Sequence, residues 1–360
     1  MFSRKSECFL ELKLPEPYLS TYRANYVEEG DRFFIIVTGK WGGKLRNCGY
    51  AFVHGKVYAA KEEMIDAVIN RFREKYGSGH LNSHQMDAGT GFILERSDHV
   101  QRSRYDILGI EFDQVSKDYD ASIRSNPVEI YMRSRTSEVL SLLARDGMSI
   151  LEIGCGTLVE SSTIKSKVSL TCAEISNQML SIAGERSRSI ENIRLELLKV
   201  SSGNIRTDQK FDIIFTTYGY LDLEDMNTIE ATLKENLKIG GLFIGAYWNR
   251  FGIIDIFLSI LLGRFKYVRE KLRGLVLPDF SRFSTATRPK KPLDFSRLSG
   301  FSDVQRKGVC TMIPPYNFLR IVKHLANKRM PFDLDRATSS LPIIKNFADY
   351  IIVVLRREHD

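Results

Sequence analysis

Short apolar runs recur along the chain after residue 148, and several of them end at a glycine or an acid. Such runs are rich in β-branched or aromatic residues and are too short for buried helices, which predicts strands. The predicted strands are Ser149–Ile153, Val168–Ala173, Ile193–Val200, Phe211–Phe215 and the segment Leu237–Ile244, which begins with a glycine turn. Asn126 followed by Pro127 predicts the start of a helix that runs through Leu143.

The first hundred residues carry a different pattern. Cys8–Leu14 and Phe33–Val37 predict strands, and Gly49–Val53 followed by His54–Tyr58 predicts a hairpin around a tight turn. A helix is expected over Glu63–Tyr76, where apolar residues recur at helical spacing. We therefore expect residues 1–100 to form a small α+β domain that binds a protein partner or the other half of the chain.

Two connecting segments in this region have less regular patterns. Trp41-Gly42-Gly43 could offer an aromatic surface beside bare backbone to a ligand, but a mobile loop anchored by a half-buried tryptophan is the preferred interpretation. Glu95–Arg104, rich in Arg, Ser and Asp, is the best candidate for an interdomain linker.

The turn after Ser149–Ile153 carries the strongest chemical signal. Gly154 and Gly156 permit positive φ angles and close approach of a ligand to the backbone. A helix expected to begin near Glu160 would aim its free N–H groups at this turn. Glu174 ends the next strand, at the spacing from which an acid reaches a ribose diol. The sequence therefore predicts a nucleoside pocket.

Two residues around this turn narrow the choice of nucleoside. Val159 stands where a dinucleotide-binding turn needs a third glycine, which disfavours a nicotinamide or flavin cofactor. Glu152 would repel a pyrophosphate and suits a ligand with a cationic amine.

With these features, Leu151–Thr157 resembles the first motif of the class I S-adenosylmethionine-dependent methyltransferases. Glu174–Leu180, Phe211–Phe215 and Leu237–Ile244 resemble later segments of that family, so the resemblance covers residues 110–360. It implies a doubly wound, seven-stranded Rossmann-like α/β sheet, with Tyr350–Leu355 as a last, antiparallel strand at the sheet edge. It also implies S-adenosyl-L-methionine as the cofactor and methyl transfer by direct displacement.

The resemblance assigns cofactor-binding positions but no catalytic residue. Glu152 would bind the amine of the cofactor, Glu174 its ribose and Ile175 its adenine. The backbone of the glycine turn would lie along its methionine chain. The full set of expected cofactor-binding residues is Glu152, Gly154, Cys155, Gly156, Thr157, Glu174, Ile175, Val200 and Thr216. Tyr119 is expected over the methionine end or in the core. Candidate bases are Tyr218, Tyr220, Asp222 and His324, none of them preferred.

This sequence departs from the family pattern at two positions. Leu158 replaces a frequent third glycine, so the following helix must pack farther from the strand. Lys199 falls near the usual place of an adenine-binding acid, which leaves that contact to backbone or to Ser201 and Ser202.

The composition of the chain indicates its domain number and its cellular compartment. The 360 residues are 43% hydrophobic and 27% charged, which is typical of a globular chain of two domains. The five cysteines are scattered and lack paired spacing, which favours a reducing compartment and disfavours a structural zinc. No signal peptide is visible. We expect a cytoplasmic protein, with peripheral contact at a membrane as an open alternative.

A metal site at His80, His84, Asp87 and His99 is disfavoured. Gly77-Ser78-Gly79 and Gly89-Thr90-Gly91 bracket these residues, so no helix is expected to hold the ligand geometry. We therefore predict no bound metal.

The segment 250–307 concentrates the charge. Its thirteen Lys or Arg and five Asp or Glu account for the whole net charge of +8. Phe251–Leu262 is apolar, and Arg264–Arg273 alternates basic with bulky residues. A lid insertion at about 250–295 is the preferred interpretation, and a helix in a membrane interface through 251–273 is the alternative. Arg288–Pro292 is predicted to be a mobile loop whose solvated charge favours anionic substrates or lipid headgroups.

Three functions remain open at this point. The preferred one is methyl transfer to a small-molecule or lipid-like acceptor, which the apolar and basic lid favours. An RNA methyltransferase is the second, since the basic segment permits nucleic-acid binding, although aromatics suited to stacking are few there. The third is a non-catalytic cofactor-binding regulator or scaffold, suggested by the N-terminal domain and the missing adenine-binding acid.

Overall fold

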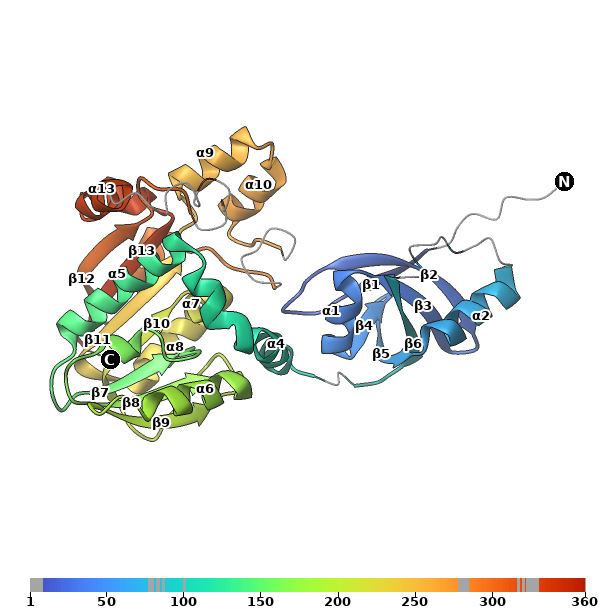
Figure 1. The fold of residues 1–360 in the computed structure, drawn as a ribbon, viewed down its shortest axis with the longest axis horizontal. Coiled ribbons are helices and arrows are strands. Elements are labelled where there is room, and N and C mark those ends of the chain that lie inside the picture. Colours follow the sequence, from blue (N-terminus) through green and yellow to red (C-terminus); the bar gives the residue numbers. More distant parts are fainter. Residues whose placement is uncertain are drawn as a thin grey trace. The chain divides into compact units, whose positions relative to one another are not determined.

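The computed structural model describes residues 9–76, 81, 85, 88–99, 102–277, 285–315, 318, 321 and 330–359. The chain divides into two compact units, whose elements are labelled in Figure 1. Unit 1 runs to Glu111, with Leu277, Thr285 and Ala286 also assigned to it, and unit 2 begins at Phe112. Each unit has its own hydrophobic core.

Unit 1 is built on a closed six-stranded barrel. Its elements are β1 (Phe9–Lys13), β2 (Thr21–Glu29), β3 (Arg32–Thr38), α1 (Lys40–Cys48), β4 (Tyr50–Val53), β5 (Lys56–Glu63), α2 (Ile65–Tyr76) and β6 (Gly89–Arg96). The strand order is β1-β2-β3-β6-β5-β4, and β4 pairs with β1 to close the barrel. The predicted hairpin is β4–β5 and the predicted helix is α2, so the α+β assignment of this part is confirmed.

The prediction of a mobile loop at Trp41-Gly42-Gly43 is wrong, because these residues lie in α1. Gly42 lies where α1 closely approaches β6, since a Cβ at this position would lie 3.0 Å from Oγ1 of Thr90. The Trp41 ring lies 5.1 Å from the ring of Tyr22. Tertiary packing of Gly42 and Trp41 therefore overrides the low helix propensity of this segment.

The prediction of an interdomain linker at Glu95–Arg104 is wrong, because the two units divide between Glu111 and Phe112, inside α4 (Arg104–Arg124). β6 continues to Arg96 and α4 begins at Arg104, so residues 97–103 connect the two elements. The next helix, α5 (Pro127–Leu143), begins as predicted, since the Asn126 side chain accepts from the N–H groups of Val128 and Glu129.

Unit 2 is a seven-stranded sheet with helices on both faces. After α4 and α5 its elements are β7 (Ser149–Ile153), η1 (Ser161–Thr163), β8 (Val168–Glu174), α6 (Asn177–Ser187), β9 (Ile193–Lys199), β10 (Phe211–Thr217), α7 (Tyr220–Leu223), α8 (Met226–Asn236), β11 (Leu237–Trp248), α9 (Ile253–Leu261), α10 (Phe265–Arg273), α11 (Pro292–Ser296), β12 (Phe301–Val309), α13 (Met330–Thr338), η2 (Ile344–Phe347) and β13 (Tyr350–Arg357). The strand order is β12-β13-β11-β10-β7-β8-β9. The predicted doubly wound sheet is confirmed.

The last strand departs from the prediction in one respect. β13 is antiparallel to β11, as expected, but it lies between β11 and β12, and β12 forms the edge of the sheet. β13 is buried along most of its length, which suits an internal strand and not an edge.

The chain changes direction across the sheet between β7 and β10. From β7 it winds through β8 to β9, and it then returns to β10 on the other side of β7. Open α/β sheets bind ligands at the carboxyl ends of the strands at such a switch point. The ends of β7, β8 and β10 are therefore the place to examine for a site.

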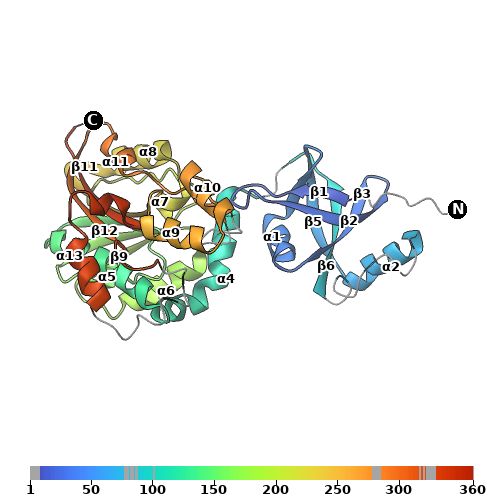
Figure 2. The same ribbon diagram turned by 90° about the horizontal axis from the view of Figure 1, so that it is seen from above.

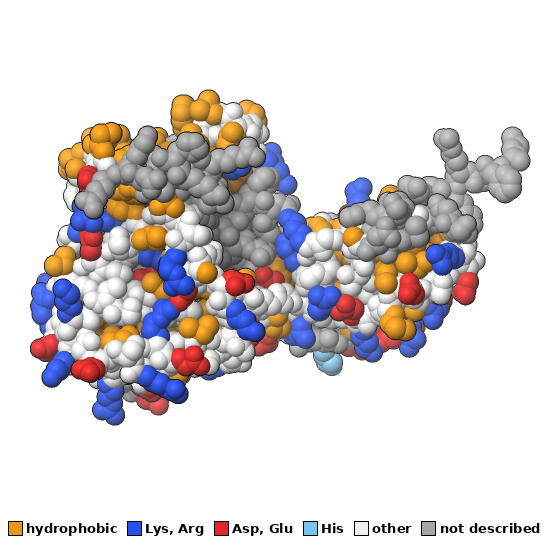
Figure 3. Space-filling model, viewed as in Figure 1, with side chains coloured by type: hydrophobic (Ala, Val, Ile, Leu, Met, Phe, Trp, Pro, Cys, Tyr) orange, Lys and Arg blue, Asp and Glu red, His pale blue; other side chains and the backbone are white. Residues whose placement is uncertain are grey.

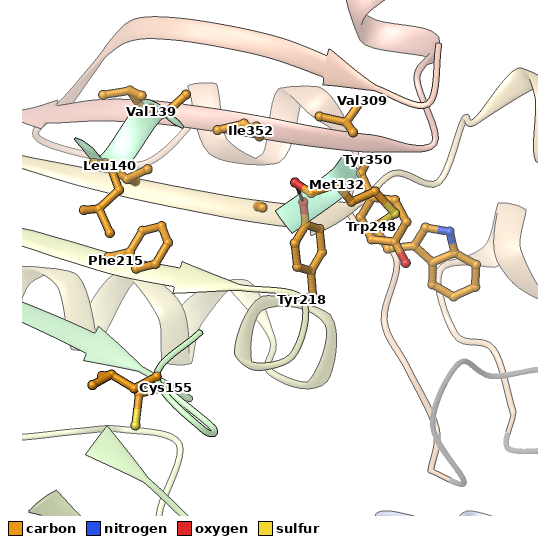
Figure 4. Packing of buried hydrophobic residues seen from close by; sticks show 14 of the residues in the cluster. Met132, Val139, Leu140, Cys155, Phe215, Tyr218, Trp248, Val309, Tyr350 and Ile352 are labelled. Atoms are coloured by element: carbon orange, nitrogen blue, oxygen red, sulfur yellow. Dashed lines mark hydrogen bonds between the residues drawn. The ribbon is translucent and has the colours of Figure 1, made fainter. Parts of the chain in front are cut away.

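Two hydrophobic clusters hold the helices against this sheet. In Figure 2, α5 and α6 lie on one side of the sheet and α8 and α11 on the other. Figure 4 shows Leu140 of α5 close to Phe215 of β10, and Met132 of α5 close to Tyr218 and Tyr350. Burial of these apolar side chains fixes the strand ends that carry the site.

Candidate functional site

The turn after β7 presents bare backbone at the carboxyl end of the sheet. Gly154 has a φ of +69° and Gly156 a φ of +54°, conformations that favour glycine. Gly154 is exposed, and a Cβ at this position would meet no heavy atom within 4 Å. Open space therefore lies beside the backbone of the turn.

The carboxylate of Glu174, at the end of β8, faces this turn. One carboxylate oxygen accepts from the Gly156 N–H at 3.0 Å, and the other accepts from the N–H groups of Ile175 at 2.7 Å and Ser176 at 2.9 Å. Burial raises the pKa of Glu174, while the three N–H groups act in the opposite direction. The backbone thus fixes the acid at the strand end.

A disulfide links the two strands beneath the turn. It joins Cys155, directly after β7, to Cys172 of β8, with Cα atoms 5.6 Å apart. The scattered cysteine spacing did not predict this pair. Cys48 and Cys310 are buried and take no part in this disulfide.

The second half of α4, in unit 2, lies against the same turn. Thr157 Oγ1 donates to Asp120 at 2.6 Å, and Arg186 of α6 also binds Asp120. A Cβ at Gly156 would lie 3.7 Å from the Tyr119 ring. Tyr119 therefore lies beside the turn.

Asp113, also on α4, binds the first residues of α6, which follow β8. It accepts from the Ser176 hydroxyl and from the Gln178 N–H at 3.0 Å, at the start of α6. Together, Asp113 and Asp120 tie α4 to the ends of β7 and β8. The sequence analysis missed both residues, and the only signal was the acid-rich pattern of 113–120.

The helix predicted near Glu160 does not form. The turn is followed by only three residues of 3₁₀ helix, η1. Leu158 has a φ of +64° and is fully buried, so this segment packs its side chain into the core where an α-helix would need αR backbone. The segment after the turn therefore does not aim the N-terminus of a long helix at it.

Glu160 instead joins a buried charged cluster behind the turn. Arg133 of α5 binds the Glu160 carboxylate and donates to the Tyr119 hydroxyl at 2.7 Å. Thr217 at the end of β10 donates to Glu160 at 3.4 Å. The cluster connects α5, α4 and β10 around one guanidinium.

Glu152 lies in this buried cluster and not on the open side of the turn. Its side chain is 2% exposed and accepts from the Ser161 hydroxyl. Burial raises the pKa of Glu152 well above its usual value, and the neighbouring charge of Glu160 adds to the rise. This environment favours the protonated acid.

The remaining predicted cofactor residues surround the same strand ends. Thr216 is buried and its hydroxyl donates to the Ile153 carbonyl at 2.9 Å. The Val200 N–H donates to the Glu174 carbonyl at 3.0 Å. Ile175 is half-buried between Glu174 and α6. All nine predicted residues therefore lie in or next to the ends of β7, β8, β9 and β10.

The candidate bases differ in their surroundings. Tyr218 is buried, and its hydroxyl donates to the Met132 carbonyl at 2.8 Å. Tyr220 donates to the Gly203 carbonyl at 2.8 Å, and Asp222 accepts from the Trp248 N–H at 2.8 Å. These bonds fit structural roles. His324 lies outside the described residues, as do His80, His84 and Asp87 of the disfavoured metal site.

The described part of the chain contains no cluster of three or more His, Cys, Asp or Glu that could hold a metal ion. The same residues include no helix long and apolar enough to cross a membrane.

The prediction of a solvated loop at Arg288–Pro292 is wrong for Lys290. Its ammonium group is buried and donates to the carbonyls of Glu224 at 2.7 Å and Arg288 at 2.8 Å. Burial lowers the pKa of Lys290 to about 8. This lysine therefore serves packing and does not offer its charge to an anionic ligand.

Comparisons with known proteins agree with this architecture. Residues 100–251 match the model of the ubiE/COQ5 methyltransferase family. An uncharacterized protein of Methanocaldococcus jannaschii is 27% identical over 169 residues, which are 46% of this chain and 62% of that protein. The chain thus matches less than two thirds of the length of this relative.

Two solved structures resemble this chain at low identity. A S-adenosylmethionine-dependent methyltransferase from Clostridium acetobutylicum is 15% identical, with 69% of this chain and 99% of that chain covered and a TM-score of 0.41. The N-methyltransferase NodS from Bradyrhizobium japonicum, solved with S-adenosyl-L-homocysteine, is 14% identical, with 69% and 100% covered and a TM-score of 0.40. At these TM-scores the likeness adds nothing to the family match.

Proposed function

We propose that the chain is a class I S-adenosylmethionine-dependent methyltransferase that transfers the methyl group of this cofactor to a small-molecule or lipid-like acceptor; the match of residues 100–251 to the ubiE/COQ5 methyltransferase family and the order of the sheet support this. The observation that carries the proposal is the pairing of an exposed glycine turn after β7 with a fixed carboxylate at the end of β8. This pair lies at the switch point of the sheet, where such folds bind nucleosides.

In this proposal, different residues of the site bind different parts of the cofactor. Glu174 accepts from the ribose hydroxyls, Ile175 packs on the adenine, and the backbone of Gly154–Gly156 passes the methionine chain. The open space beside Gly154 and the buried, anchored acid fit these roles. When bound, the cofactor supplies a methyl group that its sulfonium has already activated for displacement.

The protein's task is then to align the acceptor and exclude water. Tyr119 and α4 cover one side of the turn, and the Arg133 cluster fills the space behind it. We assign no general base, since Tyr218 and Asp222 are held by backbone groups.

The apolar or lipid-like acceptor is proposed because of the segment that follows β11. Residues 250–295, proposed to be a lid, contain α9, whose exposed side is largely apolar, and α10, which exposes Phe265 and Leu272 among basic residues. The RNA alternative is weaker, because Lys290 of the basic stretch is buried and paired with carbonyl groups.

Cell extract incubated with methyl-labelled S-adenosylmethionine and the full chain tests this function. The extract is separated after reaction into lipid-soluble, small-molecule and RNA fractions. We expect label in the first or second fraction, lost with Glu174→Ala and kept with Glu185→Ala, an exposed acid on α6. Label in RNA would contradict the acceptor, and cofactor binding without any labelled product would favour the regulator.

A further inference from the structure

The helix α9 has its polarity reversed relative to an ordinary surface helix. α9 buries only Asp255 and Ser259, four residues apart on one face. Ile253, Phe257, Ile260 and Leu261 are exposed, whereas Ile256 packs partly against the hydrophobic core. A surface helix ordinarily buries its apolar stripe and exposes its polar one. The reversal therefore needs a reason.

The buried polar face is held by a compact charge network. Lys271 of α10 is fully buried, binds Asp255, and donates to Asp349 at 2.8 Å. Its ammonium also lies 4.8 Å from the Trp248 ring, and Tyr267 donates to Asp255. Turning α9 over would break this network, so the apolar face is fixed toward the outside.

The outward face forms a continuous apolar surface over α9, the intervening turn and α10. Its members are Ile253, Phe257, Ile260, Leu261, Leu262, Phe265 and Leu272. The most exposed of them cluster at the turn, where Leu261 and Phe265 are each 66% exposed. Figure 3 shows hydrophobic side chains gathered over α9 and α10. Exposed apolar patches of this kind mark interaction sites.

Cations accompany the apolar surface. Arg264, Lys266, Arg269 and Arg273 are exposed on or beside α10, while the acid of this helix, Glu270, is half-buried. The other acid of the two helices, Asp255, is buried against Lys271. The surface therefore offers apolar side chains and an excess of positive charge together.

We propose that the α9–α10 surface docks on a lipid bilayer that carries anionic headgroups. The apolar side chains enter the boundary between headgroups and acyl chains, and the four cations bind the headgroups. α9 has 9 residues, so it is roughly 13 Å long, which is far shorter than the bilayer core of about 30 Å. The helices would lie in the interface and not span it.

The shape and charge of the α9–α10 surface favour a bilayer over a second copy of this chain as the partner that covers it. The apolar residues protrude at a turn, which a fluid lipid surface accepts without a matching groove. A second copy of this chain would bring like-charged helices together, which costs free energy. This inference rests on α9 and α10 and is independent of whether the proposed methyl transfer occurs.

The test uses the full chain and two kinds of vesicle. Co-sedimentation is measured with phosphatidylcholine alone and with about 30% phosphatidylglycerol added. We expect binding to the anionic vesicles, weaker binding to the neutral ones, and a decrease with salt. Neither cofactor nor acceptor is present, so the result is separate from the outcome of the labelling experiment.

Substitutions locate the binding surface. Phe257→Gln with Leu261→Gln, and separately Arg269→Gln with Arg273→Gln, should each weaken vesicle binding by about tenfold or more. Leu142→Gln, which changes an exposed leucine on α5, should leave it unchanged. Thermal unfolding checks that every variant is folded.

Three results would overturn the inference. They are the absence of binding to anionic vesicles, equal binding by the substituted and original chains, and a concentration-dependent dimer, seen by sedimentation, that the Phe257 and Leu261 changes abolish.

Discussion

The backbone N–H of Gly156 donates to the Glu174 carboxylate at 3.0 Å, which joins the turn after β7 to the end of β8. These residues are 18 positions apart in the chain, and the parallel pairing of β7 with β8 brings them together. The bond defines one wall of the proposed cofactor site. It also shows why a glycine turn and an acid at this spacing can be recognised from sequence.

Gly154→Ala should weaken cofactor binding more than it weakens folding. A φ of +69° costs an alanine about 1 kcal/mol, and its methyl group would enter the open space beside the turn. Gly147→Ala is the matched control, because Gly147 also has a positive φ and open surroundings but precedes β7. Calorimetry with S-adenosylmethionine and thermal unfolding of both variants measure the two effects. Equal loss of affinity in the two variants would contradict the placement of the cofactor.

Arg133→Met should destabilise the fold, and increasingly so at higher pH. The change leaves Glu160 buried without its guanidinium, beside Glu152, at a cost of about 3 kcal/mol. Acids whose folded pKa is raised are protonated in the folded state, so their stability contribution is present at low pH and lost as pH rises through the raised pKa. Urea unfolding at pH 5 and pH 8 measures the difference.

Arg336→Met is the control for this prediction. Arg336 forms an exposed ion pair with Glu138, so its loss should cost less than about 1 kcal/mol at either pH. An equally small effect of Arg133→Met would show that the cluster does not hold α5 against the turn.

Several elements could be predicted from local pattern, and others could not. β7, β8 and β10 are apolar runs with clear ends, and their order follows from the family resemblance. β2 was missed because most of its nine residues are exposed or half-buried and its sequence is largely polar. α1 was missed because it contains two glycines, of which Gly42 packs closely against Thr90 of β6, a contact that no local pattern reveals.

The buried charges depend on partners far away in the chain. Lys271 lies 78 residues from Asp349, and Arg133 lies 27 residues from Glu160. No local sequence pattern identifies such pairs, so the sequence analysis predicted that the charge of the basic segment Arg288–Pro292 is solvated. The Cys155–Cys172 disulfide is similar, since only the β7–β8 pairing places the two residues together.

Lys271→Met should cost about 3 to 5 kcal/mol of unfolding free energy, because Asp255 and Asp349 would remain buried without their cation. Burial raises the pKa of Asp349 to about 6 even with Lys271 beside it. Lys266→Met, which removes an exposed pair with Glu270 at 4.0 Å, should cost less than about 0.5 kcal/mol. Denaturant unfolding compares the two, and a small effect of Lys271→Met would contradict the fixed orientation of α9.

The stability of unit 2 should rise between about pH 8 and pH 10. Lys290 has a folded pKa of about 8, below the value of about 10.4 for an unfolded lysine. The unfolded state therefore binds more protons in this window, and unfolding becomes less favourable as pH increases, by roughly 2 kcal/mol. Lys290→Met should remove this rise, whereas Lys291→Met, at an exposed neighbour, should keep it. A rise that persists in Lys290→Met would assign it to another group.

The affinity of the full chain for S-adenosylmethionine, measured by calorimetry with Glu174→Ala and Glu185→Ala beside the original, tests the central claim most directly. The account predicts binding by the original chain and by Glu185→Ala, and a loss of about tenfold or more in Glu174→Ala, because the ribose loses its charged acceptor. Unchanged affinity in Glu174→Ala, with the variant folded, would contradict the site between β7 and β8.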